Sequence, residues 1–124
     1  MIRTLCTLAL CAVAFFGVAA ARAEPLKLHA HYDATGTNPN GSSYSGSVTI
    51  RVISEATFTI HWVISGSTYD GFGMRNGDAL AATYTISGRP GLVLYKVGDN
   101  GVLEGLWSVR GDNESGTERL TPRD

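Results

Sequence analysis

The chain has 124 residues, two cysteines and a formal net charge of −1 at pH 7, and charged residues make up 17% of it. No segment concentrates Lys and Arg, which argues against nucleic acid and anionic lipid as partners. A domain of this length buries roughly 60–70% of the surface of its unfolded chain, so it can form a modest hydrophobic core.

The first 23 residues have the pattern of a signal peptide. Arg3 supplies a positive start, residues 5–21 are almost wholly apolar, and Ala21-Arg22-Ala23 matches the small-x-small cleavage pattern. We predict cleavage before Glu24 and a single domain over residues 24–124, either periplasmic or secreted. A membrane anchor is the alternative, because about 17 apolar residues could just span a bilayer. The flank lacks stop-transfer charges, so we expect cleavage and no membrane span afterwards.

Both cysteines, Cys6 and Cys11, fall within this predicted signal peptide. The mature domain would therefore have no disulfide and depend on its core alone, although its predicted compartment permits disulfides. With Arg3 and Arg22 also removed, eight basic residues face eleven acidic ones, and the mature net charge is −3.

Beyond the signal peptide, apolar and polar residues alternate with a period of two, which is typical of half-buried β-strands. Gly, Asn, Asp and Ser interrupt the alternation at regular intervals and mark turns, with Asn76-Gly77 a strong hairpin signal. In chain order, the predicted strands cover residues 26–33, 44–53, 56–64, 69–75, 80–86, 92–97, 102–110 and 117–121.

Eight strands joined by short turns predict an antiparallel up-and-down meander, because consecutive strands with short links pair as neighbours. Closure of the meander into a small β-barrel would remove its exposed edges. A two-sheet sandwich is the alternative, but it usually needs longer crossovers. No stretch has a convincing helical period. The sequence therefore predicts an all-β barrel.

The predicted core consists of large apolar residues that share parity in the best-alternating strands. Three segments also repeat a bulky residue followed two positions later by glycine: Tyr44-x-Gly46, Tyr69-x-Gly71-x-Gly73 and Leu103-x-Gly105-x-Trp107. We interpret these glycines as relief of crowding inside a narrow barrel, with space for a ligand as the alternative. The residues predicted to be buried are Val48, Ile50, Phe58, Ile60, Trp62, Leu80, Tyr84, Leu103 and Trp107.

Residues 35–43 contain two glycines, a proline and two asparagines, with no apolar anchor. This composition predicts a loop without regular structure and with high mobility. A mobile loop beside a barrel mouth can act as a lid, so it is the first candidate for a ligand gate.

Several turn and packing motifs across residues 30–121 resemble those of a group of short secreted proteins of Gram-negative bacteria. Some members are labelled fibronectin-binding protein, so the resemblance implies a host-matrix adhesin as one alternative function. The alternating meander is also similar to avidin and lipocalin barrels, at the level of fold only, which implies no particular ligand. The motifs are Gly36-Thr-Asn-Pro-Asn-Gly41, Tyr44-Ser-Gly46, His61-Trp62, Tyr69-Asp-Gly-Phe-Gly73, Gly77-Asp-x-Leu80, Gly91-Leu-x-Leu-Tyr95, Gly105-Leu-Trp107 and Gly116-Thr-Glu118.

The leading functional hypothesis is a non-enzymatic binding module for a small apolar ligand or a protein partner, with no cofactor. Three inward aromatic residues, Trp62, Tyr84 and Trp107, are the candidate ligand-binding residues. A hydrolase is the least favoured alternative, because no cysteine remains and no nucleophile motif is present. Glu104 is predicted to face outward, and a pair of inward carboxylates for acid and base roles is missing.

Metal binding is weakly indicated. His29, His31 and Asp33 share one strand face, but residues two apart on a strand lie about 6.5–7 Å apart, so a neighbouring strand would have to help. His61 has outward parity too, yet its strand is two strands away. We therefore predict no metal site and a solvated polar face instead.

Arg110-Gly111-Asp112 is the tripeptide that integrins recognise, and it falls in a predicted loop. The same residues are ordinary turn formers, so the adhesin hypothesis gains little from them.

A second group of apolar residues has the opposite parity to the core and would face outward if the barrel closes. Contiguous outward stripes mark interfaces, whereas scattered surface apolar residues are normal. We predict a dimer or partner interface here, which makes a homo-oligomer possible. Its predicted centre is Leu92, Leu94, Val102 and Leu106, next to Ala79 and Ala81.

Overall fold

The computed structural model describes residues 27–123. The predicted signal peptide, including its cleavage site, lies outside the described residues. Within 27–123, no helix is long and apolar enough to cross a bilayer.

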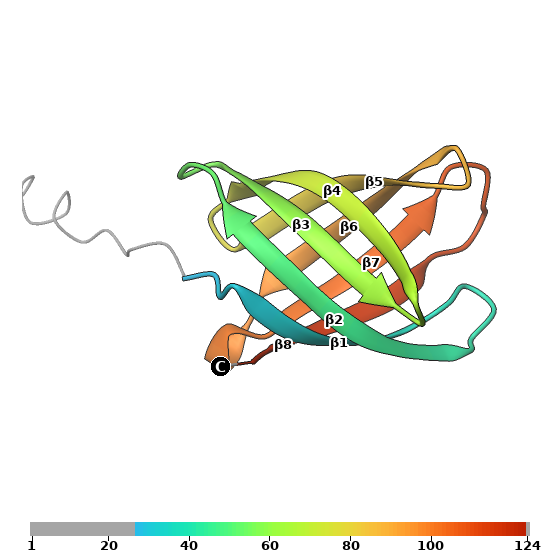
Figure 1. Cartoon of the computed structure of the whole chain (residues 1–124), viewed down its shortest axis with the longest axis horizontal. Helices are drawn as coiled ribbons and strands as arrows, with labels where there is room; N and C mark the ends of the chain where they lie inside the picture. Colours follow the sequence, from blue (N-terminus) through green and yellow to red (C-terminus); the bar gives the residue numbers. More distant parts are fainter. Residues whose placement is uncertain (1–26, 124) are drawn as a thin grey trace, which may run out of the picture.

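Eight strands run in sequence order around a closed antiparallel barrel, and every strand pairs with its neighbours in the chain (Figure 1). The pairing of the first strand with the last closes the barrel, with Ala34 opposite Leu120. The predicted all-β up-and-down barrel is therefore confirmed. The elements are β1 (His31–Thr37), β2 (Ser43–Val52), β3 (Thr57–Ile64), β4 (Ser67–Asn76), β5 (Ala79–Ile86), β6 (Arg89–Val97), the short 3₁₀ turn η2 (Asp99–Gly101), β7 (Leu103–Val109) and β8 (Gly116–Pro122).

The prediction of an irregular loop over residues 35–43 was wrong at both ends, and at the second end Ser43 already belongs to β2. Thr35 to Thr37 belong to β1 and pair with both β2 and β8. Strand pairing on both sides overrides their turn-like composition. Only residues 38–42 remain as a loop, and hydrogen bonds within the loop hold it together. The backbone N–H of Asn38 donates to the Ser42 carbonyl at 2.8 Å, and the backbone N–H of Ser42 donates to Asn40 Oδ1 at 2.9 Å.

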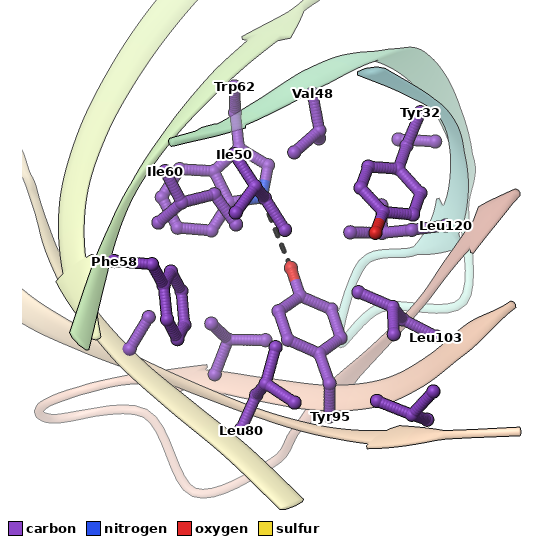
Figure 2. Packing of buried hydrophobic residues seen from close by; sticks show 14 residues of the cluster. Tyr32, Val48, Ile50, Phe58, Ile60, Trp62, Leu80, Tyr95, Leu103 and Leu120 are labelled. Carbon is purple, nitrogen blue, oxygen red and sulfur yellow. Dashed lines mark hydrogen bonds between the residues drawn. The ribbon is translucent and has the colours of Figure 1, made fainter. Parts of the chain in front are cut away.

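Alternate residues of every strand point into the barrel and form one continuous core. Tyr95 reaches across this core toward Trp62 from the opposite wall (Figure 2). Of the nine residues predicted to be buried, Tyr84 and Trp107 are only half-buried. The correction has a simple reason: both lie near an open end of the barrel, where parity alone does not ensure burial. The core residues are Tyr32, Ala34, Val48, Ile50, Phe58, Ile60, Trp62, Leu80, Ala82, Val93, Tyr95, Val97, Leu103 and Leu120.

Inward glycines make room for aromatic rings from the next strand. In five cross-strand pairs, a side chain added to the glycine would collide with the ring of its partner, so the ring lies across the glycine backbone. The crowding interpretation of the glycines is thus supported, with a detail that sequence alone did not reveal: the partner stands directly opposite. The pairs are Gly36–Tyr44, Gly73–Phe58, Gly91–Tyr84, Gly105–Tyr95 and Gly116–Trp107.

Replacing Gly73 by Ala is expected to lower the free energy of unfolding by about 1–3 kcal/mol. The new Cβ would meet both the buried Phe58 ring and the Ala81 carbonyl oxygen. Gly98→Ala is the matched control, because the nearest atom to its Cβ is 3.5 Å away. Urea unfolding of both variants checks the prediction, and equal losses would contradict it.

The two ends of the barrel differ. One end carries the β1–β2, β3–β4, β5–β6 and β7–β8 links, at the right of Figure 1. At the other end, Leu28 packs against the core and the His29 amide donates to the Tyr32 hydroxyl at 2.7 Å. The candidate ligand site lies at the first of these ends.

Candidate ligand site

A pocket of about 240 Å³ opens at the end of the barrel that carries the β1–β2, β3–β4, β5–β6 and β7–β8 links. It is smaller than the roughly 300–1,000 Å³ of sites for drug-sized ligands, so it suits a molecule of about one or two rings. No Lys or Arg is among its lining residues, which are Asn38, Tyr44, Trp62, Ile64, Ser65, Ser67, Tyr69, Tyr84, Ile86, Val93, Trp107 and Glu118.

The three aromatic residues predicted from the sequence as ligand-binding, Trp62, Tyr84 and Trp107, all line this pocket. The rings of Trp62 and Tyr84 have centroids 5.4 Å apart and are tilted by 59°. Trp107 contacts Tyr44 edge to face, with centroids 6.2 Å apart. The arrangement forms aromatic walls on several sides of a small opening.

Glu118 on β8 adds a carboxylate to this aromatic pocket. Its side chain points inward and is only 5% exposed. Oε2 accepts hydrogen bonds from Trp62 Nε1 at 3.0 Å and from the Tyr95 hydroxyl. Oε1 accepts one from the Tyr44 hydroxyl at 2.9 Å. Three donors directed at one carboxyl group suit its ionised form, which only accepts.

The backbone explains why these donors reach Glu118. Its direct neighbours across the sheet are Gly36 on β1 and Gly105 on β7. The Tyr44 ring lies over the first glycine and the Tyr95 ring over the second. Both tyrosines therefore lean over a side-chain-free position and bring their hydroxyls to the carboxylate between them.

Sequence reasoning missed Glu118 as a site residue. A signal was nevertheless present, because Gly116, Glu118 and Leu120 share one parity in the last predicted strand. Leu120 is a core residue, and its face is the inward one. Glu104, by contrast, is exposed as predicted, and it accepts from Arg119 Nη1 at 2.8 Å on the outer surface.

The tyrosines around the carboxylate are held in their neutral form. Burial, followed by the negative charge of Glu118, raises the pKa of Tyr84 to about 12. The same two causes raise the pKa of Tyr44 and that of Tyr95 well above 10. Burial also raises the pKa of Tyr32, at the other end of the barrel.

We expect the barrel to lose stability as the pH rises above about 10. In the unfolded chain these tyrosines release their protons near pH 10, whereas the folded protein retains them to higher pH. The unfolded state then binds fewer protons, so the free energy of unfolding falls with rising pH. Absorbance of tyrosinate near 295 nm should rise together with the loss of circular dichroism. Ionisation of Tyr44, Tyr84 and Tyr95 near pH 10 in the folded barrel would contradict the prediction.

The structure does not gather the candidate metal ligands. Within residues 27–123, no three His, Cys, Asp or Glu side chains are placed to hold one ion. Asp33 lies 3.6 Å from Arg123, and His61 Nδ1 lies 2.7 Å from Asp70 Oδ1.

Arg110-Gly111-Asp112 lies in the loop between β7 and β8, as predicted. Arg89 ties this loop down, because its Nη1 donates to the Arg110 carbonyl at 3.0 Å and to Asp112 at 3.3 Å. The carboxylate that an integrin would read is therefore already paired.

The outward apolar residues form rows that continue across the sheet. Met74, Ala81, Leu94 and Leu106 stand opposite one another on β4, β5, β6 and β7. A parallel row on the first three of these strands contains Phe72, Thr83 and Leu92. The large apolar residues of both rows are each more than half exposed, whereas Val102 is half-buried and precedes β7. The alternation of the sequence predicted that Leu92, Leu94 and Leu106 face outward, but it did not identify Phe72 and Met74 as part of this surface.

No family model matches the chain, and no curated protein does.

Proposed function

We propose that this protein is a binding module that holds a small, mainly apolar ligand in the open end of its barrel. The observation that carries the proposal is the pocket itself: about 240 Å³, walled by Trp62, Tyr84, Trp107 and Tyr44, and bordered by a few polar groups. Apolar walls with a small number of fixed polar groups are the common composition of small-molecule sites.

Several features support a pocket that is formed before the ligand arrives. The glycines opposite Tyr84 and Trp107 leave the space in which each ring lies closely against the barrel wall. Trp107 Nε1 donates to the Thr117 carbonyl at 3.2 Å, and Trp62 Nε1 is committed to Glu118. Rings held in this way lose little conformational freedom when a ligand binds, which favours affinity.

Intrinsic fluorescence provides a direct test, because both tryptophans of the chain line the pocket. A neutral probe with one ring, 2-phenylethanol, should change the tryptophan emission in a saturable way. Tyr84→Ala should weaken the affinity roughly three- to tenfold, since it removes one aromatic wall.

Thr85→Ala is the matched control, because this exposed neighbour on the same strand faces the other way. It should leave the affinity unchanged. Equal effects of both substitutions, or no saturable response to any aromatic probe, would argue against a ligand site at the barrel mouth.

A second proposal rests on a different observation, the outer face of β4–β7. We propose that a second copy of the chain covers it. The rows through Phe72, Met74, Leu92, Leu94 and Leu106 contain no charged residue. Rows of exposed apolar side chains can pack against the same rows of another copy, and a two-fold dimer brings the same patch of both subunits together.

A further inference from the structure

The ligand pocket contains a buried negative charge that no cation among the described residues balances. Among residues 27–123, the hydrogen-bond partners of the Glu118 carboxyl group are Tyr44, Trp62 and Tyr95, all of them neutral. The ion pairs of the described residues lie elsewhere, on the outer surface. Burying a charge is costly unless it is paired, so a cation brought by the ligand would relieve this cost.

The carboxylate retains room for one more donor. An ionised carboxylate offers about four acceptor positions, and three are occupied here. Oε2 accepts two hydrogen bonds, whereas Oε1 accepts only one. Glu118 is also one of the residues that line the pocket, so a ligand N–H group is a suitable partner for the remaining acceptor position.

The aromatic walls of the pocket also favour a cationic ligand. Tyr44, Trp62, Tyr84 and Trp107 surround the opening, and the faces of aromatic rings attract cations. No basic side chain lines the pocket to compete with a cationic ligand or to repel it. Aromatic side chains beside a buried carboxylate are a combination that favours ammonium groups over neutral or anionic ones.

We propose that the ligand of this pocket is a small organic amine, whose ammonium group pairs with Glu118 while its apolar part lies between the aromatic rings. This inference deepens the proposed function and depends on it, because it assigns a chemical class to the ligand of the same pocket. The amine acts as a ligand only, and no covalent step is involved.

The test compares three probes of nearly equal shape and different charge: phenethylamine, 2-phenylethanol and phenylacetate. Each is titrated into the whole mature protein, and the tryptophan emission is followed. Phenethylamine should bind about tenfold or more tightly than 2-phenylethanol, and phenylacetate should bind most weakly. Equal affinity for the amine and the alcohol would overturn the amine inference and leave the proposed function standing. No binding by any of the three would contradict both.

Glu118→Gln links the preference to the carboxylate. This variant keeps the size of the side chain but removes its charge, so the preference for phenethylamine over 2-phenylethanol should fall to about twofold or less. A preference that persists in a folded Gln variant would overturn the role of Glu118. If the variant does not fold, added salt on the unaltered protein decides: it should leave the amine preference largely intact, because buried pairs are weakly screened. A preference abolished by salt would place the amine on an exposed surface instead.

Discussion

Replacing Trp62 by Ala is expected to lower the free energy of unfolding by about 3–5 kcal/mol. The indole is only 5% exposed and fills the space between the core and the pocket. Its Nε1 also donates to Glu118 and, at 3.3 Å, to the Tyr95 hydroxyl. The substitution therefore opens a cavity and removes a donor from a buried carboxylate, and both effects act in the same direction.

Two further variants separate these effects in urea unfolding. Trp62→Phe keeps most of the apolar volume and loses the donor, so it should cost less than Trp62→Ala. Val52→Ala shortens an apolar side chain that is more than half exposed on β2, away from the proposed dimer face, and it should cost less than about 1 kcal/mol. A loss below about 1 kcal/mol for Trp62→Ala would show that this residue does not support the barrel.

The double change Leu94→Glu and Leu106→Glu should convert a dimer into a folded monomer. The two residues are direct partners across β6 and β7, and both are more than half exposed. Burying two carboxylates in a paired apolar face is far more costly than exposing them on a monomer. Sedimentation at matched concentration checks the prediction, with circular dichroism as the measure of folding.

A control for charge is available on the other side of the barrel. Ser45→Glu and Thr49→Glu change exposed residues on β2 and give the protein the same net charge. This control should remain a dimer. If the unaltered protein is monomeric and purifies without a partner, the interface proposal fails. If the Leu94 and Leu106 variant unfolds, these side chains support the barrel itself.

The strands could be predicted because alternation is a local property. In β3, for example, Phe58, Ile60 and Trp62 alternate with polar residues, and their inward direction followed directly. The closure of β1 on β8 could not be read in this way, because it joins residues about 85 positions apart. Thr35 to Thr37 were assigned to a loop for this reason. Their strand conformation depends on pairing with two neighbouring strands, which local composition does not reveal.

At the pocket, too, local alternation could be predicted from the sequence, whereas the arrangement of neighbouring strands could not. Parity selected Trp62, Tyr84 and Trp107, but burial at the barrel mouth depends on where each strand ends relative to its neighbours. The role of Glu118 depends on the register between β1, β7 and β8, which puts glycines on both sides of it. Register is set by the packed face and the turns together, so a single strand pattern does not contain it.

The most direct test of the ligand site uses the two indole N–H signals in a ¹H–¹⁵N NMR spectrum, which arise from Trp62 and Trp107 alone. Both line the pocket, Trp62 from β3 and Trp107 from β7. On titration with phenethylamine, both signals should shift and saturate at one common concentration, while amide signals of the outer face around Leu94 stay in place. Two unmoved indole signals, with shifts confined to the outer face, would contradict a binding site at the open end of the barrel.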